Sequence, residues 1–252
     1  MTAGVVAEAV TVKYGTNVAV DAVSLAVTPG RVVGLIGPNG AGKTSFIDAI
    51  TGLTAMGGGR VHLNGVDVTT WAAHRRANAG MRRTFQALRL FEDLTVAENL
   101  VVAAETDTRF GLLRDLVRPR QAAVATGRAL ELTGLQAFAD VLPRDLPAGT
   151  RRLVGVARAV AARPNVLLLD EPAAGLDTHE THELGTVLER LAAEGVGLLL
   201  VEHDTELVFR VSHHVVAIDF GTMIAEGAPA HVRQSDALIA AYLGVAPDGG
   251  EA

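Results

Sequence analysis

Residues 37–45 carry the strongest chemical signal in the chain. They read GPNGAGKTS and contain the pattern G-x-x-x-x-G-K-T, the Walker A loop. The loop follows the apolar run 32–36 and precedes residues 45–50, which have helical character. Its glycines let successive backbone N–H groups point at a phosphate chain, and the start of a helix adds unpaired N–H groups and a positive dipole end. The alternative, a glycine-rich turn with a chance lysine, does not explain this context, so the loop predicts binding of a nucleoside triphosphate.

The positions of this loop have different expected contacts. Lys43 is expected to reach the β- and γ-phosphates, and the hydroxyl of Thr44 is expected to ligate Mg²⁺. The other residues expected to bind the nucleotide here are Gly37, Pro38, Asn39, Gly40, Ala41, Gly42 and Ser45. These contacts predict a nucleoside triphosphate and Mg²⁺ as the bound cofactors.

Acidic and polar side chains end other predicted strands. The apolar run 166–169 leads into Asp170 and Glu171, the Walker B pattern, and the run 197–201 leads to His203. A carboxylate at the tip of a buried strand is costly without a cation, and Mg²⁺ on the nucleotide would meet that need. A lone histidine is more often structural, but its place after a buried strand favours a functional role. Gln86 ends a predicted strand, 81–85, where its amide could reach a metal or an attacking water.

Tyr14 lies in a predicted turn between two predicted strands, residues 5–12 and 19–27. Two interpretations remain open for its ring. It can pack against the end of a strand, or it can stack on an adenine ring, an interaction of about 1–3 kcal/mol for a base on an aromatic face. Stacking tolerates different bases, so Tyr14 does not distinguish ATP from GTP.

Composition bounds the class of protein. The chain has 252 residues, of which 49% are hydrophobic, and a formal net charge of −6, which excludes a disordered chain and a polybasic nucleic-acid binder. It has no cysteine, so disulfides and thiolate metal sites are excluded. No apolar run approaches the roughly 18–20 residues of a membrane span, so work at a membrane would need a partner. A solvated face is the preferred interpretation of the local arginines Arg75, Arg76, Arg82 and Arg83.

The remaining elements follow from periodicity and turn residues. Asn64 and Gly65 predict a hairpin turn, and Thr95 with Glu98 predicts a capping box at the start of a helix over 95–105. Residues 87–94 form an apolar loop, which indicates either a covering contact or a partner surface. Further helices are expected over 71–79, 121–134, 153–163 and from residue 177 to 194, further strands over 215–219 and 223–226, and a disordered tail over 246–252.

In this order and spacing the motifs resemble the nucleotide-binding domains of ABC ATPases over nearly the whole chain. The resemblance adds a signature segment at residues 146–150 and a D-loop at 174–177. It implies an α/β fold, a P-loop NTPase with a RecA-like core, an antiparallel β subdomain and a helical subdomain. The single domain 1–252 would then divide into a catalytic core, about 1–86 and 163–245, and a helical part, about 87–162.

Several stretches are similar to the ATPase subunits of branched-chain amino-acid importers, namely residues 83–86, 89–91, 94–100, 170–176 and 241–244. The resemblance implies transmembrane permease subunits contacted through residues 86–94, a second ATPase subunit, and indirectly an extracytoplasmic substrate-binding protein. It implies a peripheral location on the cytoplasmic face of the cell membrane. Lipopolysaccharide-export and urea-import ATPases share much of this pattern and remain alternatives. Soluble ABC ATPases of translation or DNA repair, which carry two domains or a coiled-coil insert, fit less well.

The resemblance also assigns roles. It makes Glu171 the general base and puts His203 on the γ-phosphate, with Lys43 and Gln86 completing the catalytic set. Thr44 and Gln86 would ligate Mg²⁺, Asp170 would hold it largely through water, and Ser45 would add an α-phosphate contact. The nucleotide of the opposite subunit would be contacted by Pro147, Ala148, Gly149 and Asp177.

At the signature the chain departs from the family pattern L-S-G-G-Q, because residues 146–150 read LPAGT. Pro147 offers neither the hydroxyl nor the N–H of a serine, although Gly149 keeps its amide and the following helix keeps its dipole. This favours the hypothesis of an asymmetric heterodimer in which the site capped by this chain's signature is weak.

Overall fold

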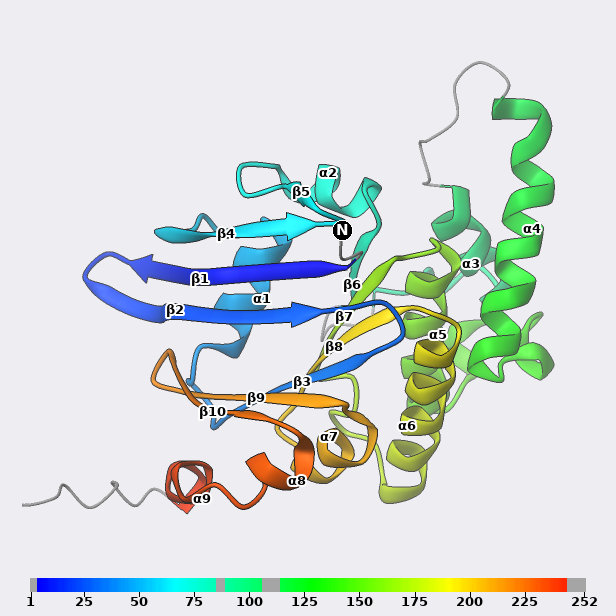
Figure 1. Ribbon diagram of the computed structural model, residues 1–252. Coiled ribbons are helices and arrows are strands. Elements are labelled where there is room, and N and C mark those ends of the chain that lie inside the picture. The colour runs from blue at the N-terminus through cyan, green and yellow to red at the C-terminus, as the bar shows by residue number, and fades with distance from the viewer. Residues whose placement is uncertain (1–3, 85–88, 106–113, 244–252) are drawn as a thin grey trace, which may run out of the picture.

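Two sheets and a set of helices make up the structure, a computed structural model that describes residues 4–84, 89–105 and 114–243 (Figure 1). The strands are β1 (Val5–Tyr14), β2 (Asn17–Val27), β3 (Val32–Ile36), β4 (Gly58–Leu63), β5 (Val66–Asp67), β6 (Met81–Thr84), β7 (Val166–Asp170), β8 (Gly197–Val201), β9 (His214–Asp219) and β10 (Thr222–Gly227). The helices are α1 (Lys43–Thr51), α2 (Ala73–Asn78), α3 (Val96–Glu105), α4 (Arg114–Thr133), α5 (Ala148–Ala161), α6 (Thr178–Ala193), α7 (Thr205–Val211), α8 (Pro229–Val232) and α9 (Asp236–Leu243).

The larger sheet positions the chemical residues. Its strand order is β10-β9-β3-β8-β7-β6, with β9, β3, β8, β7 and β6 parallel and β10 antiparallel. Strands β3, β7 and β8 are buried along their whole length, as their continuous apolar runs predict. Because parallel strands end at the same edge, the segments after β3, β8 and β7 meet there, as ligand-binding segments of open α/β sheets do.

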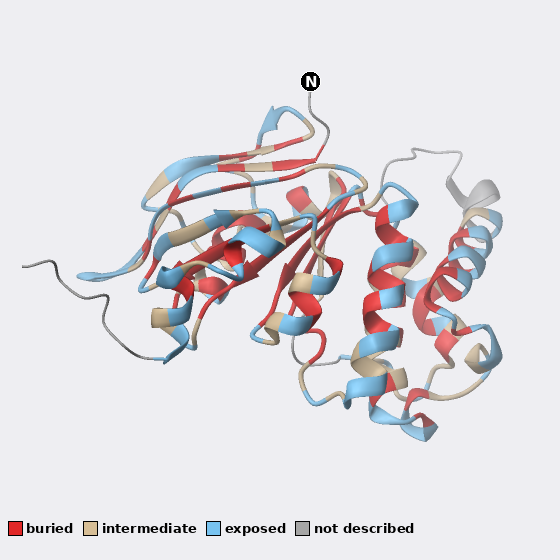
Figure 2. Ribbon diagram, turned by 60° about the horizontal axis from the view of Figure 1, so that its bottom comes forward, coloured by how far each residue is buried: buried red, intermediate tan, exposed pale blue. Residues whose placement is uncertain are grey.

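The smaller sheet is antiparallel, in the order β2-β1-β4-β5, and helix α1 packs between it and the larger sheet. Phe46, Ile47 and Ile50 of α1 are fully buried in this core. On the opposite face of the larger sheet, a second core contains side chains of α3, α4, α5, α6 and α7. Figure 2 shows buried residues concentrated along the strands and on the inward sides of these helices.

The α/β fold predicted for a P-loop NTPase is confirmed, including the hairpin at Asn64 and Gly65 and the capping box of Thr95 and Glu98. Helix α4 begins at Arg114, earlier than the predicted residue 121. Helices α7, α8 and α9 were not predicted. The proposed division into a core and a helical part remains a prediction, and the tail 246–252 lies outside the described residues. Within the described ranges, no helix is long and apolar enough to cross a membrane.

Candidate nucleotide-binding site

The loop between β3 and α1 presents an uncapped helix start. Gly42 is the N-cap of α1, with φ of 101°, and a Cβ there would lie 2.3 Å from the carbonyl oxygen of Ala19. No side chain caps this helix, whereas Asp177 accepts a hydrogen bond from the Glu180 N–H at the start of α6. The first N–H groups of α1, which belong to Lys43, Thr44 and Ser45, therefore lack a capping side chain. Such a helix start suits an anion.

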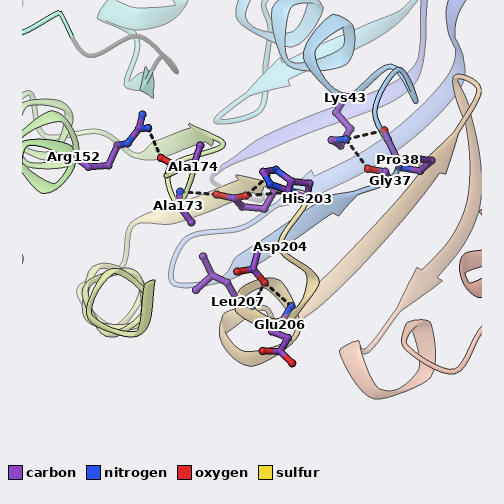
Figure 3. Close-up of polar contacts among 11 residues, drawn as sticks. Gly37, Pro38, Lys43, Arg152, Ala173, Ala174, His203, Asp204, Glu206 and Leu207 are labelled. Carbon is purple, nitrogen blue, oxygen red and sulfur yellow. Dashed lines mark hydrogen bonds and ion pairs between the residues drawn. The ribbon is translucent and has the colours of Figure 1, made fainter. Parts of the chain in front are cut away.

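Lys43 is held inside the curve of this loop. Its Nζ donates hydrogen bonds to the carbonyl oxygens of Gly37, at 2.6 Å, and Pro38, at 3.0 Å (Figure 3). Only 6% of the residue is exposed. Burial lowers the pKa of the ammonium group, and the carboxylates of Glu171, Asp170 and Glu202 oppose that shift. The side chain fixes the loop and brings a cation to its interior.

Asp170, at the end of β7, forms a buried ion pair with Arg83 of β6, with 2.7 Å between Oδ2 and Nη2 and both side chains 7% exposed. The other terminal nitrogen of Arg83 pairs with Asp48 of α1. One guanidinium thus ties the loop helix to the Walker B strand, a geometry for which the forked donor set of arginine is suited. The solvated-face prediction is therefore wrong for Arg83, and also for Arg76, which is buried.

Two carboxylates lie at the edge where β7 and β8 end, that of the partly exposed Glu171 and that of the buried Glu202. Glu171 has a left-handed backbone, with φ of 46°, and its N–H donates to the Val201 carbonyl at 2.8 Å. Glu202 is fully buried and accepts hydrogen bonds from the N–H groups of Ala173, at 2.7 Å, and His203, at 3.2 Å. Burial raises the pKa of Glu202. Sequence analysis missed Glu202, although a charged residue ending an apolar strand was a usable signal.

His203 follows β8 and is 55% exposed, with Nδ1 lying 3.7 Å from Oε2 of Glu202. In Figure 3 the ring and Ala173, which belongs to the segment after Glu171, lie on either side of the carboxylate of Glu202. Glu202 therefore joins the His203 turn to that segment through hydrogen bonds from both sides. The position of His203 and that of the segment after Glu171 therefore both depend on the Glu202 carboxylate.

The phosphate-binding loop and neighbouring segments line a hollow of about 700 Å³. Its lining is Tyr14, Asn17, Val18, Ala19, Asn39, Gly40, Ala41, Gly42, Lys43, Thr44, Ser45, Glu171 and Phe220. The structure thus brings Tyr14 from the antiparallel sheet to the phosphate loop, and Glu171 to the same space. Phe220, between β9 and β10, was not singled out from the sequence.

The signature residues lie elsewhere. Pro147 is the N-cap of α5, and a Cβ on Gly149 would come within 2.1 Å of Oε1 of Glu180. Arg152 of α5 donates to the Ala174 carbonyl at 2.6 Å (Figure 3). The described lining of the hollow includes neither residues 146–150 nor Asp177. Gln86 lies outside the described residues.

The donor set fits Mg²⁺. Thr44 offers a hydroxyl and Asp170 a carboxylate, and hard oxygen donors are what this ion prefers. Within the part of the chain that the structure describes, no group of three or more His, Asp or Glu side chains could hold a metal. Magnesium at nucleotide sites takes only one or two protein ligands and completes its shell with phosphates and water, so a protein-only cage is not required.

A second hollow, of about 490 Å³, lies between β6, α3 and α5. Leu90, Phe91 and Val102 give it an apolar surface, and Phe91 and Val102 are exposed. The guanidinium of Arg158 stacks over the Phe91 ring, with 5.2 Å between its carbon and the ring centre. The other arginines in the lining are Arg82, Arg83, Arg89 and Arg152. We refer to this hollow as the arginine groove.

Among curated proteins, the chain is similar to the high-affinity branched-chain amino acid transport ATP-binding protein BraF of Pseudomonas aeruginosa, with 38% identity over 94% of this chain and 96% of that protein. It is 37% identical to the corresponding protein LivG of Escherichia coli K12, over 93% of this chain and 95% of LivG. The lipopolysaccharide export system ATP-binding protein LptB of Haemophilus influenzae matches at 32%, over 94% of this chain and 96% of LptB.

Among solved structures, the ADP conformation of MJ1267, an ATP-binding cassette of an ABC transporter, superposes with a TM-score of 0.85 and 28% identity. The match covers 97% of this chain and all of that one. A family model described as ABC transporter matches residues 20–174, more than half of the chain. Together with the loop and the hollow that it shares with Glu171, these matches show that the chain belongs to the ABC transporter family, as an ATP-binding and ATP-hydrolysing protein.

Proposed function

We propose that the chain is the ATPase subunit of an importer of branched-chain or other hydrophobic amino acids. The observation that carries this proposal is the 37–38% identity to BraF and LivG along nearly the full length of each chain. LptB, named for lipopolysaccharide export, is less similar at 32%. An importer needs permease subunits and an extracytoplasmic binding protein, and this chain would work at the cytoplasmic face of the membrane.

The roles of the site residues follow from the geometry and from phosphoryl-transfer chemistry. Lys43 and the N–H groups at the start of α1 bind and orient the phosphates. Thr44, Asp170 and Gln86 would hold Mg²⁺. When bound, the ion would neutralise part of the negative charge on the phosphates. Arg83 fixes the carboxylate of Asp170 in position through its ion pair. These residues supply positioning and charge, which phosphoryl transfer requires more than covalent chemistry.

Glu171 and His203 act on water and on the terminal phosphate. The carboxylate of Glu171 lines the hollow and can take a proton from a water molecule in it. His203 presents an exposed ring at the end of the neighbouring strand, where it can donate to a terminal phosphate oxygen. The buried Glu202 accepts a hydrogen bond from the His203 N–H and so fixes the backbone that carries the ring.

A second ATPase subunit would complete the site. Residues 146–150 are separate from the hollow lining of their own chain, which supports their action on the nucleotide of a partner subunit. Pro147 begins α5 without a side-chain cap, so apart from the Thr150 hydroxyl this segment offers a partner's nucleotide only backbone donors and the helix dipole. The hydrolysis site capped by this chain would be the weaker of two.

The arginine groove would receive the permease. Asn99, which is fully buried, accepts a hydrogen bond from the Phe91 N–H and donates one to the Phe91 carbonyl, so the exposed Phe91 ring is held by a rigid backbone. Apolar side chains surrounded by arginines suit a short permease helix that carries an apolar face and carboxylates. The proposed contact lies within the predicted region 86–94, of which residues 89–94 are described.

The proposal is tested by co-expression with the permease and ATPase genes that neighbour it, followed by reconstitution. We expect the permease to co-purify with this chain, ATP-dependent uptake of leucine by vesicles, and loss of co-purification in Phe91→Asp. Uptake of an unrelated solute, or extraction of lipopolysaccharide without leucine uptake, would contradict the importer proposal. Normal co-purification with the permease and normal ATP-dependent uptake in Phe91→Asp would contradict the assignment of the arginine groove.

A further inference from the structure

The turn between β9 and β10 holds an aromatic residue in a costly conformation. Phe220 and Gly221 are the two loop residues of this hairpin, between the paired residues Asp219 and Thr222. Their φ angles are 43° and 78°, so both are left-handed, as in a type I′ turn. For a bulky side chain, this conformation costs roughly 1–2 kcal/mol.

Another two-residue hairpin within the described residues, between β4 and β5, shows the usual solution. Between β4 and β5, Asn64 and Gly65 have φ angles of 53° and 80°, nearly the same backbone as Phe220 and Gly221. Asn-Gly is the favoured pair for this turn because asparagine tolerates left-handed backbone and glycine has no Cβ. The β9–β10 turn keeps the glycine but replaces the asparagine with a phenylalanine.

Burial does not offset this cost, because Phe220 is 87% exposed. A large apolar ring that is both strained and exposed gains nothing from the core of its own chain. Such a residue points to a partner outside the chain. The position of the turn indicates which partner.

The turn is fixed against the phosphate loop. The N–H of Gly221 donates to the Ala41 carbonyl at 3.0 Å, and the N–H of Asp21 donates to the Gly221 carbonyl at 2.8 Å. Phe220 also lines the 700 Å³ hollow, together with Tyr14 and the loop. The hollow therefore has two exposed aromatic side chains, which come from different sheets.

We propose that Phe220 is a second aromatic contact for the base of the nucleotide, beside Tyr14. A purine base is planar and offers two apolar faces and an edge, and stacking on an aromatic ring does not depend on hydrogen-bond pattern. Phe220 has no donor or acceptor in its side chain, so it adds affinity for the nucleotide without selecting adenine over guanine. This proposal rests on nucleotide binding at the same hollow and specifies its base subsite.

The test uses a substitution with opposite expected effects on folding and binding. Phe220→Asn restores the favoured turn pair, so the thermal midpoint of the free chain should rise. Its Kd for ATP in calorimetry should increase by about 5- to 150-fold, the fold-change that corresponds to loss of one base–aromatic contact. The Kd for GTP should increase by a similar factor. Binding of tripolyphosphate, which has no base, should be unchanged.

Met223→Ala is the matched control, since Met223 is exposed on the same hairpin but is absent from the lining of the hollow. It should leave both affinities unchanged. Unchanged ATP affinity in Phe220→Asn, or equal weakening of tripolyphosphate, would overturn the proposal, and the ring would then serve a protein contact or the loop alone. If the wild-type chain bound no ATP, nucleotide binding itself would fail, which is a distinguishable result.

Discussion

Ionisable side chains are buried around the phosphate-binding loop, and each has a compensating group. Asp170 is paired with Arg83, and Lys43 donates to two loop carbonyls. The carboxylate of Glu202 accepts two backbone hydrogen bonds. Because an uncompensated buried charge costs several kcal/mol or changes its protonation, these partners lower the cost of burying ionisable groups at the site.

The carboxylate of Glu171 should be needed for ATP turnover but not for ATP binding. We expect Glu171→Gln to retain ATP affinity but to lower turnover by about 10²–10⁴-fold, because the amide cannot accept a proton from water. Single-turnover hydrolysis of radiolabelled ATP, measured with the partner subunits present, checks this expectation. Wild-type turnover in the variant would remove Glu171 from the role of general base.

Glu202 should make stability depend on pH. Its pKa is raised by burial, so in the folded state it holds its proton at pH values where the unfolded chain has already lost it. The folded state then binds more protons, and stability falls as pH rises from the usual glutamate value toward the raised one. Thermal midpoints of wild type and Glu202→Gln between about pH 4 and pH 8 should show this fall only in the wild type. Parallel profiles would contradict it.

At the scale of elements, α1 is secured at both ends. Its start is held by the Lys43 contacts, and its end by Arg76 of α2. The guanidinium of Arg76 donates to the carbonyls of Ala49 and Ile50 and also to those of Trp71 and Thr69. A cation at this end also complements the helix dipole. The phosphate-binding helix is thus tied to the segment that joins β5 to α2.

Replacement of Arg76 by methionine should destabilise the folded chain. Several buried carbonyl groups would lose a charged donor, so we expect the free energy of unfolding to fall by about 2–4 kcal/mol in urea titration. Arg75→Met is the matched control, because Arg75 is exposed and stacks on Trp71, and should cost less than about 1 kcal/mol. Similar losses in the two variants would show that Arg76 does not support α1.

The elements with strong local signals were predictable from the sequence. Fully apolar runs gave β3, β7 and β8, and the Asn64 turn and the Thr95 capping box follow from local residue chemistry. The ion pairs of Arg83 were not predictable, since its partners lie 35 and 87 residues away in the chain. Phe220 was missed because phenylalanine is not a turn former, and its role depends on a hollow that only the folded chain assembles.

At the scale of the whole molecule, the hollow and residues 146–150 are separate parts of one chain. The loop and Glu171 line the hollow, while the start of α5 packs against α6 through Gly149 and Glu180. Arg152 further ties α5 to the Ala174 carbonyl. In the proposed arrangement, a second ATPase subunit would bring its own signature segment to this chain's hollow.

This asymmetry predicts weak activity of the chain alone. A homodimer would cap both sites with residues 146–150, so we expect slow, weakly cooperative ATP hydrolysis that increases when the second ATPase subunit is added. Pro147→Ser should raise homodimer activity and, as a better N-cap, stabilise the chain by about 1 kcal/mol. Vigorous cooperative hydrolysis by the unmodified chain, followed by coupled-enzyme assay, would count against the asymmetric arrangement.

Every role proposed for this site requires that the uncapped start of α1 and the ammonium of Lys43 bind the triphosphate. Calorimetric titration with Mg-ATP tests this claim directly on the wild type, on Lys43→Ala and on Lys13→Ala, which removes the exposed lysine of β1. We predict saturable heat for the wild type and Lys13→Ala, and binding at least about tenfold weaker for Lys43→Ala, a loss of roughly 1.4 kcal/mol or more. No saturable heat for the wild type, or equal affinity in Lys43→Ala, would contradict it.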